Sequence, residues 1–213
     1  MMPAPAAAVL VHGLWMHGLA MMYLKRGLRQ AGIPALCYSY ASVRRSLTAN
    51  AEQLAQFAGS LRASRIDWVA HSLGGLVVLK ALLHPAMPPG RVVLLGVPYA
   101  GIYAARSMVR HAWGARAMGK SIGEWLSSQA DRPQSFPHHE IGVIAGTLSV
   151  GFGRVVARGL PVPNDGVVTL AETELAAARD RILLPVSHSA MLVSQRVVHQ
   201  TAHFMQQGRF DHA

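Results

Sequence analysis

A serine stands where an apolar run of the chain gives way to an apolar helical stretch. Ser72 follows the run Ile66–Ala70 and precedes Leu73–Leu83, and its flanking small residues are Ala70, Gly74 and Gly75. A strand that turns sharply into a helix needs small neighbours, and the strained turn lifts the serine hydroxyl above the sheet edge. The next amide then points to where an oxyanion would form. The pattern predicts Ser72 as a nucleophile and the Leu73 amide as an oxyanion donor; the alternative is an ordinary turn serine.

Three segments carry a resemblance to a known family. The Ser72 segment resembles the nucleophile elbow of the α/β-hydrolase fold, in its bacterial lipase and esterase branch, with Ala70 where the motif most often has glycine. The segment 9–15 looks like the strand and His-Gly loop of bacterial lipases, which implies that the Leu14 amide is the second oxyanion donor and that His12 holds the loop. The segment 95–101 is similar to a Gly-Thr-Pro-His segment, but the Thr and His are replaced, so no role carries over.

The resemblance also implies where the rest of a catalytic triad lies. In this family the acid and then the histidine follow the serine along the chain. His188 follows the last apolar run, Ile182–Val186, where the family places its base. Asp165 lies in a turn rich in Pro and Gly that resembles the family's acid loop, although an Asx-type turn residue is the alternative. The other acidic residues after Ser72 are Glu124, Asp131, Glu140, Glu172, Glu174, Asp180 and Asp211.

We expect the substrate pocket to include Trp15, His71 and Tyr99. No cofactor or metal is expected. His199 and His203 have a spacing that could bind a metal, but no third ligand is evident. His138, His139 and Glu140 form another candidate cluster, yet adjacent strand residues point to opposite faces. The segment 114–121 fits the phosphate-loop pattern G-x-x-x-x-G-K-S, but a charged, helix-like stretch precedes it instead of a buried strand, so the match is interpreted as accidental.

The elements that would position these residues alternate along the chain. Near-continuous apolar runs predict strands covered on both faces, at Ala8–Val11, Ile33–Tyr38, Ile66–Ala70, Val92–Val97, Ile141–Ala145 and Ile182–Val186. Helical stretches are expected at Leu19–Ala31, Ala49–Ala63, Leu73–Leu83 and Ala190–Met205. This order predicts an α/β fold with an open, mostly parallel sheet of about six strands and helices on both faces.

One interval breaks this alternation. Residues 101–139 have amphipathic helical spacing where a short connection would suffice. The interval emerges from the C-terminal end of a strand, where open α/β sheets bind ligands. This position favours a helical cap or lid; the alternative is a helical insertion packed on the edge of the sheet. The prediction is a single α/β-hydrolase domain over residues 1–213 with a cap at 101–139.

Composition limits the class of protein. The chain has 213 residues, of which 51% are hydrophobic and 14% charged, so one well-cored domain is expected rather than a disordered chain. A single cysteine, Cys37, excludes an intrachain disulfide. Residues 1–24 carry no charged side chain but are interrupted by Pro, Gly and His and lack a positive n-region, which indicates a buried strand and loop in a cytoplasmic protein.

The formal charge of +10 leaves the partners open. The main hypothesis is a serine hydrolase that cleaves carboxylic esters, of small molecules or lipids, through Ser72, Asp165 and His188. An acyltransferase or thioesterase with the same triad is the alternative. A non-enzymatic basic protein that binds anionic lipid or nucleic acid is a third class; we expect no nucleic acid partner, whereas the basic charge allows peripheral contact with an anionic membrane. The oligomeric state is left open.

Overall fold

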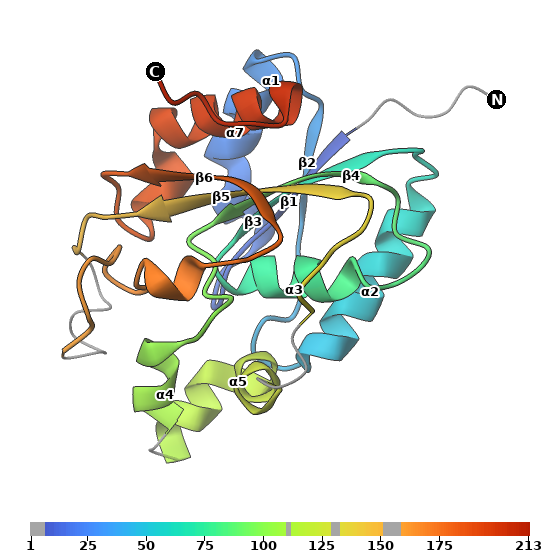
Figure 1. The fold of residues 1–213 in the computed structure, drawn as a ribbon. Helices are drawn as coiled ribbons and strands as arrows, with labels where there is room; N and C mark the ends of the chain where they lie inside the picture. The colour runs from blue at the N-terminus through green and yellow to red at the C-terminus, as the bar shows by residue number, and fades with distance from the viewer. Residues whose placement is uncertain (1–6, 110–111, 129–132, 151–158) are drawn as a thin grey trace.

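The computed structural model describes residues 7–109, 112–128, 133–150 and 159–213. Its sheet has six strands in the order β2-β1-β3-β4-β5-β6, and every neighbouring pair is parallel. The strands are β1 (Ala7–Val11), β2 (Ala35–Tyr38), β3 (Ile66–His71), β4 (Gly90–Leu95), β5 (His139–Gly146) and β6 (Ala178–Leu184). This confirms the predicted fold class, and the strand order places β1, β3, β4 and β5 inside the sheet (Figure 1).

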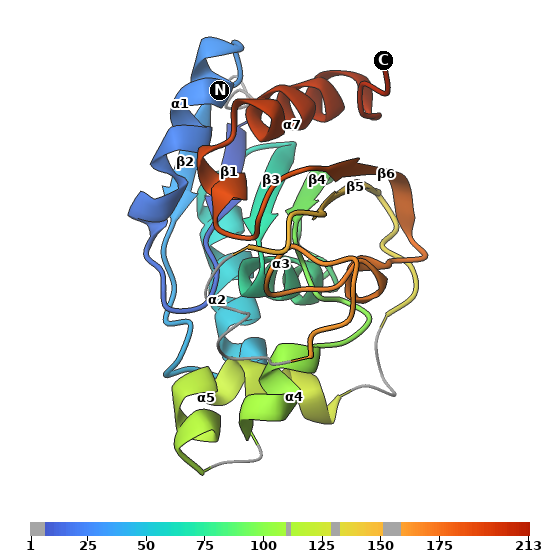
Figure 2. The same cartoon turned by 90° about the vertical axis from the view of Figure 1, so that its left-hand side faces the viewer.

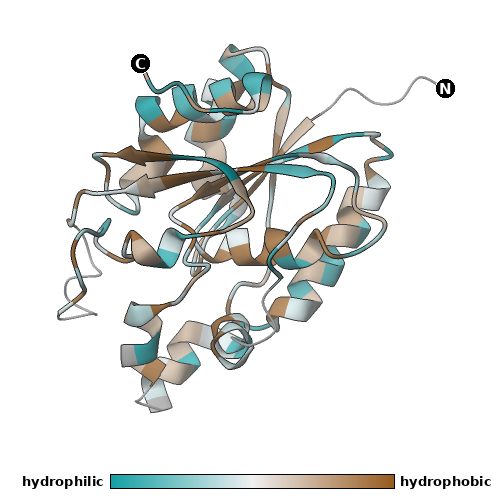
Figure 3. Ribbon diagram, in the orientation of Figure 1, coloured by the Kyte–Doolittle hydropathy of each residue, from teal (hydrophilic) through white to brown (hydrophobic). Residues whose placement is uncertain are grey.

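Helices cover both faces of the sheet, as predicted. One face packs against α2 (Leu47–Ser60) and α3 (Leu73–Ala81), and the other against α1 (Met22–Gln30) and α7 (Gln195–Gln207). Figure 2 shows these two layers on either side of the strands, with α4 (Tyr103–Val109) and α5 (Ala112–Ser127) beyond one end of the sheet. The hydropathy colours in Figure 3 follow this burial, since the strands are mostly brown and the outer helices carry teal patches.

The N-terminal region agrees with the expected strand and loop over its described part. After β1 the chain passes through a loop into the short 3-10 helix η1 (Gly18–Met21) and then α1. Residues 1–6 lie outside the described part of the chain. Within residues 7–213, apart from the gaps given above, no helix is both long and apolar enough to cross a membrane.

Several predicted boundaries were wrong, most clearly at the edge strand. The last strand begins at Ala178 and ends at Leu184, earlier than the apolar run suggested. Because β6 pairs only with β5, its charged residues 179–181 remain partly exposed, so a continuously apolar pattern does not mark this strand. The strand β4 likewise begins and ends two residues before the expected run Val92–Val97.

The predicted terminal helix Ala190–Met205 is two helices. A 3-10 helix, η4 (Ala190–Val193), ends at Ser194, whose side chain accepts a hydrogen bond from the Val197 amide and so begins α7. Ser46 begins α2 in the same way, accepting from the Ala49 amide at 3.1 Å. Serine at these positions satisfies an amide that has no partner within the helix.

The apparent phosphate loop lies inside α5. Gly119 has φ 76° and breaks this helix into two parts. The Ser121 hydroxyl is buried, donates to the Arg45 carbonyl at 2.8 Å and accepts from the Asn50 amide at 3.1 Å. No described strand leads into the segment, and its serine packs against the loop before α2, so this match is accidental, as predicted.

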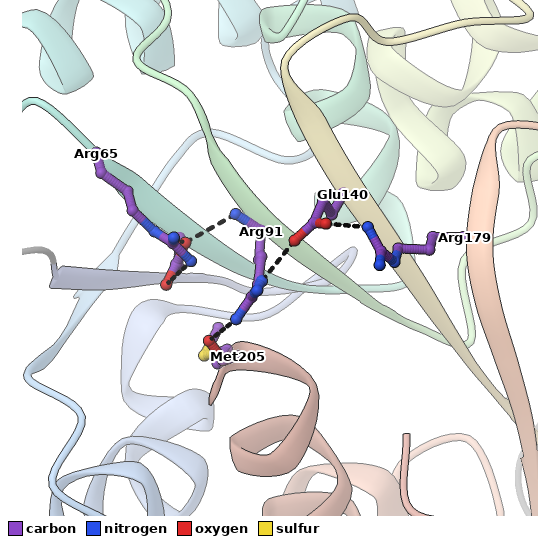
Figure 4. A network of polar contacts seen from close by, with 6 residues as sticks. Arg65, Arg91, Glu140, Arg179 and Met205 are labelled. Carbon is purple, nitrogen blue, oxygen red and sulfur yellow. Dashed lines mark hydrogen bonds and ion pairs between the residues drawn. The ribbon is translucent and has the colours of Figure 1, made fainter. Parts of the chain in front are cut away.

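A charged network ties the N-terminal ends of the inner strands together (Figure 4). Asp67 pairs with Arg65 at 3.0 Å and accepts from the Arg91 amide at 2.7 Å. The Arg91 guanidinium donates to Glu140 at 2.6 Å and to the Met205 carbonyl of α7 at 2.7 Å. Glu140 also pairs with Arg179 of β6. The network lies at the opposite end of the strands from Ser72 and connects the strands from β3 to β6. We therefore interpret it as stabilising the sheet.

Candidate active site

Ser72 occupies the sharp turn between β3 and α3. Its backbone has φ 52° and ψ −126°, a conformation that costs a non-glycine residue energy and that persists only where the surroundings enforce it. The Ser72 amide donates to the Leu95 carbonyl at 3.0 Å, which fixes the turn to β4. A Cβ at Gly74 would lie 2.3 Å from the His12 carbonyl oxygen, so only glycine lets α3 approach the β1 loop so closely. The small residues after Ser72 thus have the packing role that the sequence indicated.

His188 and Asp165 form a buried pair. Asp165 Oδ2 accepts a hydrogen bond from His188 Nδ1 at 2.7 Å, and the two residues are 1% and 7% exposed. Asp165 Oδ1 accepts from the amides of Val167 and Val168 at 2.9 and 2.7 Å. Both carboxylate oxygens are therefore occupied, and because Nδ1 is the nitrogen that donates to Asp165, Nε2 is the ring nitrogen left to accept a proton. The His188 amide also donates to the Asp165 carbonyl at 2.8 Å.

Gly96, at the end of β4, makes room for this pair. It has φ 55°, and a Cβ there would lie 3.0 Å from Asp165 Oδ2 and 3.1 Å from His188 Nδ1. No site role was predicted for this segment. The available signal was a glycine directly after an inner strand, at the edge of the sheet where ligands bind.

The loop after β1 is held by His12 from inside the protein. Its Nε2 accepts from the Tyr40 amide at 3.3 Å, so Nδ1 carries the proton and donates to the Gly13 carbonyl at 2.8 Å. Burial lowers the pKa of His12, which keeps this tautomer neutral. The Trp15 amide donates to Ser42 Oγ at 3.2 Å. These contacts fix the loop on both sides of Leu14.

His71 lies beneath His188 and is fully buried. Its Nε2 donates to the His188 carbonyl at 3.0 Å, and the two rings lie 4.6 Å apart between centroids. Burial, followed by the neighbouring His188, lowers the pKa of His71 to about 3, so the ring is neutral. Among the described residues, none forms a hydrogen bond with His71 Nδ1. A neutral His71 supports the backbone of His188 without adding a competing positive charge.

A cavity of about 280 Å³ joins these residues. Its lining includes Ser72, His188, Leu14, Leu73 and the predicted pocket residues Trp15 and His71. The remaining lining residues are mostly apolar and come from the loops after β1, β4 and β6, from α4 and α5 and the residue before α4, and from the segment after Asp165: Met16, Pro98, Ile102, Ala104, Ala105, Met108, Met118, Ile122, Val167, Val168, Glu172 and Ser189. Of the three residues predicted as a triad, Ser72 and His188 therefore line one mostly apolar cavity, and Asp165 is hydrogen-bonded to His188.

Tyr99 does not line the cavity, which corrects the prediction. Its ring is buried against Trp125 and Phe136, and its hydroxyl donates to the Pro133 carbonyl. Tyr99 lies four residues beyond the end of β4, and its ring packs into the hydrophobic core with Trp125 of α5 and with Phe136 rather than into the cavity.

The sequence model of the α/β-hydrolase family matches residues 8–209. The chain belongs to the α/β-hydrolase family. Among solved structures it is similar to the lipase BlEst2 from Bacillus licheniformis in mature form, with a TM-score of 0.79 and 20% identity over 96% of this chain and 93% of that one. It is also similar to an α/β-hydrolase fold protein from Chitinophaga pinensis, with a TM-score of 0.68 and 16% identity over 97% and 91%. A carboxylesterase from Bacillus subtilis matches with a TM-score of 0.56 and 14% identity over 97% and 85%.

In this α/β hydrolase, Glu172 joins the segment after Asp165 to the start of α4. Its Oε2 accepts from the amide and hydroxyl of Thr169 at 2.8 and 2.9 Å. Its Oε1 accepts from the amide of Tyr103 at the start of α4. In the sequence Glu172 was only one of the competing acids, and nothing in its spacing indicated a partner 69 residues away.

The helix α5 is held to the loop after β1, to the loop before α2 and to α2 itself. The Trp15 indole donates to the Ala117 carbonyl at 2.8 Å, and the Lys120 amide donates to the Val43 carbonyl at 3.0 Å because the break at Gly119 turns it out of α5. Thr48 donates to the Glu124 carboxylate through its amide and its hydroxyl. The helices α4 and α5 thus line the cavity from one side, while polar contacts hold α5 to two loops and to the start of α2.

The candidate metal clusters do not assemble in the described part of this hydrolase. No group of three or more His, Cys, Asp or Glu residues there could hold a metal ion. His203 Nδ1 donates to the Arg209 carbonyl at 2.9 Å. Glu140 is engaged by two arginines, and neither His138 nor His139 contributes to that network.

Proposed function

We propose that the protein is a serine hydrolase that cleaves carboxylic esters through an acyl-enzyme. The observation that carries the proposal is the strained Ser72, at a cavity that it shares with His188, whose other ring nitrogen is bound to Asp165. A hydroxyl becomes an effective nucleophile when an oriented base accepts its proton, and this arrangement supplies the serine, the base and the orienting acid.

In the proposed reaction the serine is the nucleophile, the histidine is the general base and the acid orients the histidine. His188 Nε2 accepts the Ser72 proton as Ser72 Oγ attacks the ester carbonyl, and Asp165 stabilises the imidazolium. The amides of Leu14 and Leu73 donate to the oxyanion, which provides about 10²- to 10³-fold in rate per donor. His188 then protonates the leaving alcohol, and water activated by the same histidine releases the acid.

The cavity supports an apolar acyl or alcohol group in the substrate. Ile102, Met108, Met118 and Ile122 reach it from the cap, and its volume lies near the lower end of small-molecule pockets. We assign residues 101–139 to a cap that excludes water from the ester, since Trp15 and Glu172 fasten its two sides to the loops around Ser72. The expected substrates are therefore esters with short or medium apolar chains.

Hydrolysis of p-nitrophenyl esters of increasing chain length tests the proposal. Ser72→Ala should abolish hydrolysis without changing the melting temperature. Ser60→Ala is the matched control, because Ser60 is exposed at the end of α2 and its hydroxyl donates to the Phe57 carbonyl of the same helix. Adding an alcohol acceptor, and comparing an acyl-CoA, separates an esterase from an acyltransferase or thioesterase. Activity that persists in Ser72→Ala would reject the assignment.

A further inference from the structure

The helices over one face of the sheet contain no acidic residue. The elements η1, α1, η4 and α7 cover residues 18–30 and 190–207, apart from Ser194, and none of their residues is Asp or Glu. Their exposed basic side chains are Arg26, Arg29 and Arg196. The first acidic residue of the whole chain is Glu52. We call these four elements the α1–α7 layer; Figures 1 and 2 both show α1 beside α7 in it. The layer holds positive charge with nothing in its own helices to neutralise it.

The same layer exposes large apolar side chains. Leu19 is 72% exposed and Val193 is 61% exposed, and Met22 and Tyr23 are 45% and 41% exposed. The Tyr23 hydroxyl donates to the Gln195 side chain at 3.2 Å, so the start of α1 lies against the junction of η4 and α7. Apolar residues that cluster on neighbouring elements beside basic residues mark an interaction surface rather than scattered exposure.

The exposed face of α1 is ordered along the helix. Met22 and Arg26 are four residues apart and Arg29 follows three later, so they share one face, while Leu24 and Leu28 are buried against the sheet. The apolar end of this face adjoins the cavity, because Met16 just before η1 and Ser189 just before η4 both line it. The arginines lie toward the far end of α1.

We propose that the α1–α7 layer docks on the surface of an anionic lipid bilayer. Leu19, Met22 and Val193 enter the boundary between headgroups and acyl chains, Tyr23 lies at headgroup level, and the arginines bind lipid phosphates. Apolar side chains beside a basic face are the composition of helices that lie in a membrane interface. In this orientation the cavity lies beside the bilayer, so an apolar ester can pass from the lipid to Ser72. The lipid surface is a partner additional to the proposed ester hydrolysis and does not require it.

Co-sedimentation of the full chain with vesicles tests the docking surface. Phosphatidylcholine vesicles that contain phosphatidylglycerol should bind the protein in a salt-sensitive manner, and pure phosphatidylcholine vesicles should bind it much less. The double variant Arg26→Gln/Arg29→Gln should weaken binding by about 30-fold, since each basic residue at such a surface contributes about fivefold. Leu19→Ser/Met22→Ser should weaken it by roughly tenfold or more through lost apolar burial.

The matched control is Arg44→Gln/Arg62→Gln, which removes the same charge from exposed residues outside the layer. It should retain wild-type binding, and all three variants should hydrolyse soluble esters as the wild type does. Loss of anionic vesicle binding in the control to the same extent would overturn the proposal, because net charge alone would then explain it. So would a wild type that does not bind these vesicles, or a concentration-dependent dimer that only Leu19→Ser/Met22→Ser dissolves. Vesicle binding by Ser72→Ala separates this test from that of the hydrolase activity.

Discussion

Replacing Asp165 by asparagine tests how the candidate triad is oriented. Asp165 Oδ1 accepts from two backbone amides, of Val167 and Val168, and a side-chain NH₂ group cannot replace it there. The side-chain oxygen of the Asp165→Asn variant must therefore face these donors, which turns its NH₂ group toward His188 Nδ1. To accept from that NH₂, His188 must carry its own proton on Nε2, the nitrogen that has to receive the Ser72 proton.

The expected result is a loss of about 10⁴-fold in kcat, the usual cost of the wrong histidine tautomer in such a triad. The assay is steady-state hydrolysis of a soluble p-nitrophenyl ester, with circular dichroism and melting temperature to confirm folding. Asp211→Asn is the matched control, because the Asp211 side chain lies near the C-terminus and accepts a hydrogen bond from the amide of Ala213. A folded Asp165→Asn protein with kcat within about tenfold of the wild type would refute the role given to Asp165.

Two further substitutions, each paired with a control variant, test other parts of the structure. Gly96→Ala would place a Cβ 3.0 Å from Asp165 Oδ2, and kcat should fall by roughly tenfold to a hundredfold through displacement of His188. Gly32→Ala has a similar positive φ but open space around it, so it should lose about 1 kcal/mol of stability and no activity. Glu140→Gln should lower stability at neutral pH by about 1 kcal/mol, or roughly 2–4 °C in melting temperature. The hydrogen bond from Arg91 lowers the pKa of Glu140, so this contribution is present above the unfolded-state pKa and should disappear as the pH falls through the lowered value. The prediction for Glu140 would be contradicted if wild type and Glu140→Gln differed in stability as much at acid pH as at neutral pH, or if Glu174→Gln lowered stability equally.

The inner part of the fold could be predicted because burial leaves a direct mark on sequence. Strands β1, β3 and β5 are covered on both faces and appear as apolar runs, and the Ser72 turn follows from the small residues that it requires. The edge strand β6 could not be located in this way, since the charged residues Arg179 and Asp180 belong to it. The bounds of β6 are determined by its backbone hydrogen bonds to β5, and these bonds leave no pattern in the residue types.

Residues of the candidate site could be predicted where the chemistry requires one residue type. They could not be predicted where contacts between distant parts of the chain determine the position of a side chain. Ser72, Asp165 and His188 were predicted from chemistry and from family resemblance; Ser72 and His188 line one cavity, and Asp165 is hydrogen-bonded to His188. Tyr99 was misplaced because its ring packs against Trp125 and Phe136, which lie far along the chain and reach it only in the folded protein. Glu172 is engaged by an amide 69 residues away, a partner that only the folded chain brings near.

The structure shows where part of the positive charge of the chain lies, which the composition alone does not. The formal charge of +10 is unrelated to the cavity, whose lining is mostly apolar. Part of it lies on the α1–α7 layer, which has no acidic residue. The vesicle measurements address the exposed arginines of this layer separately from the chemistry at Ser72.

Labelling by a fluorophosphonate probe tests the central claim most directly, because such a probe phosphonylates only a serine that its protein activates. We expect one label, mapped by mass spectrometry to the peptide that contains Ser72, absent in Ser72→Ala and strongly slowed in Asp165→Asn. A folded wild-type protein that remains unlabelled, or that carries the label on another serine, would contradict the assignment.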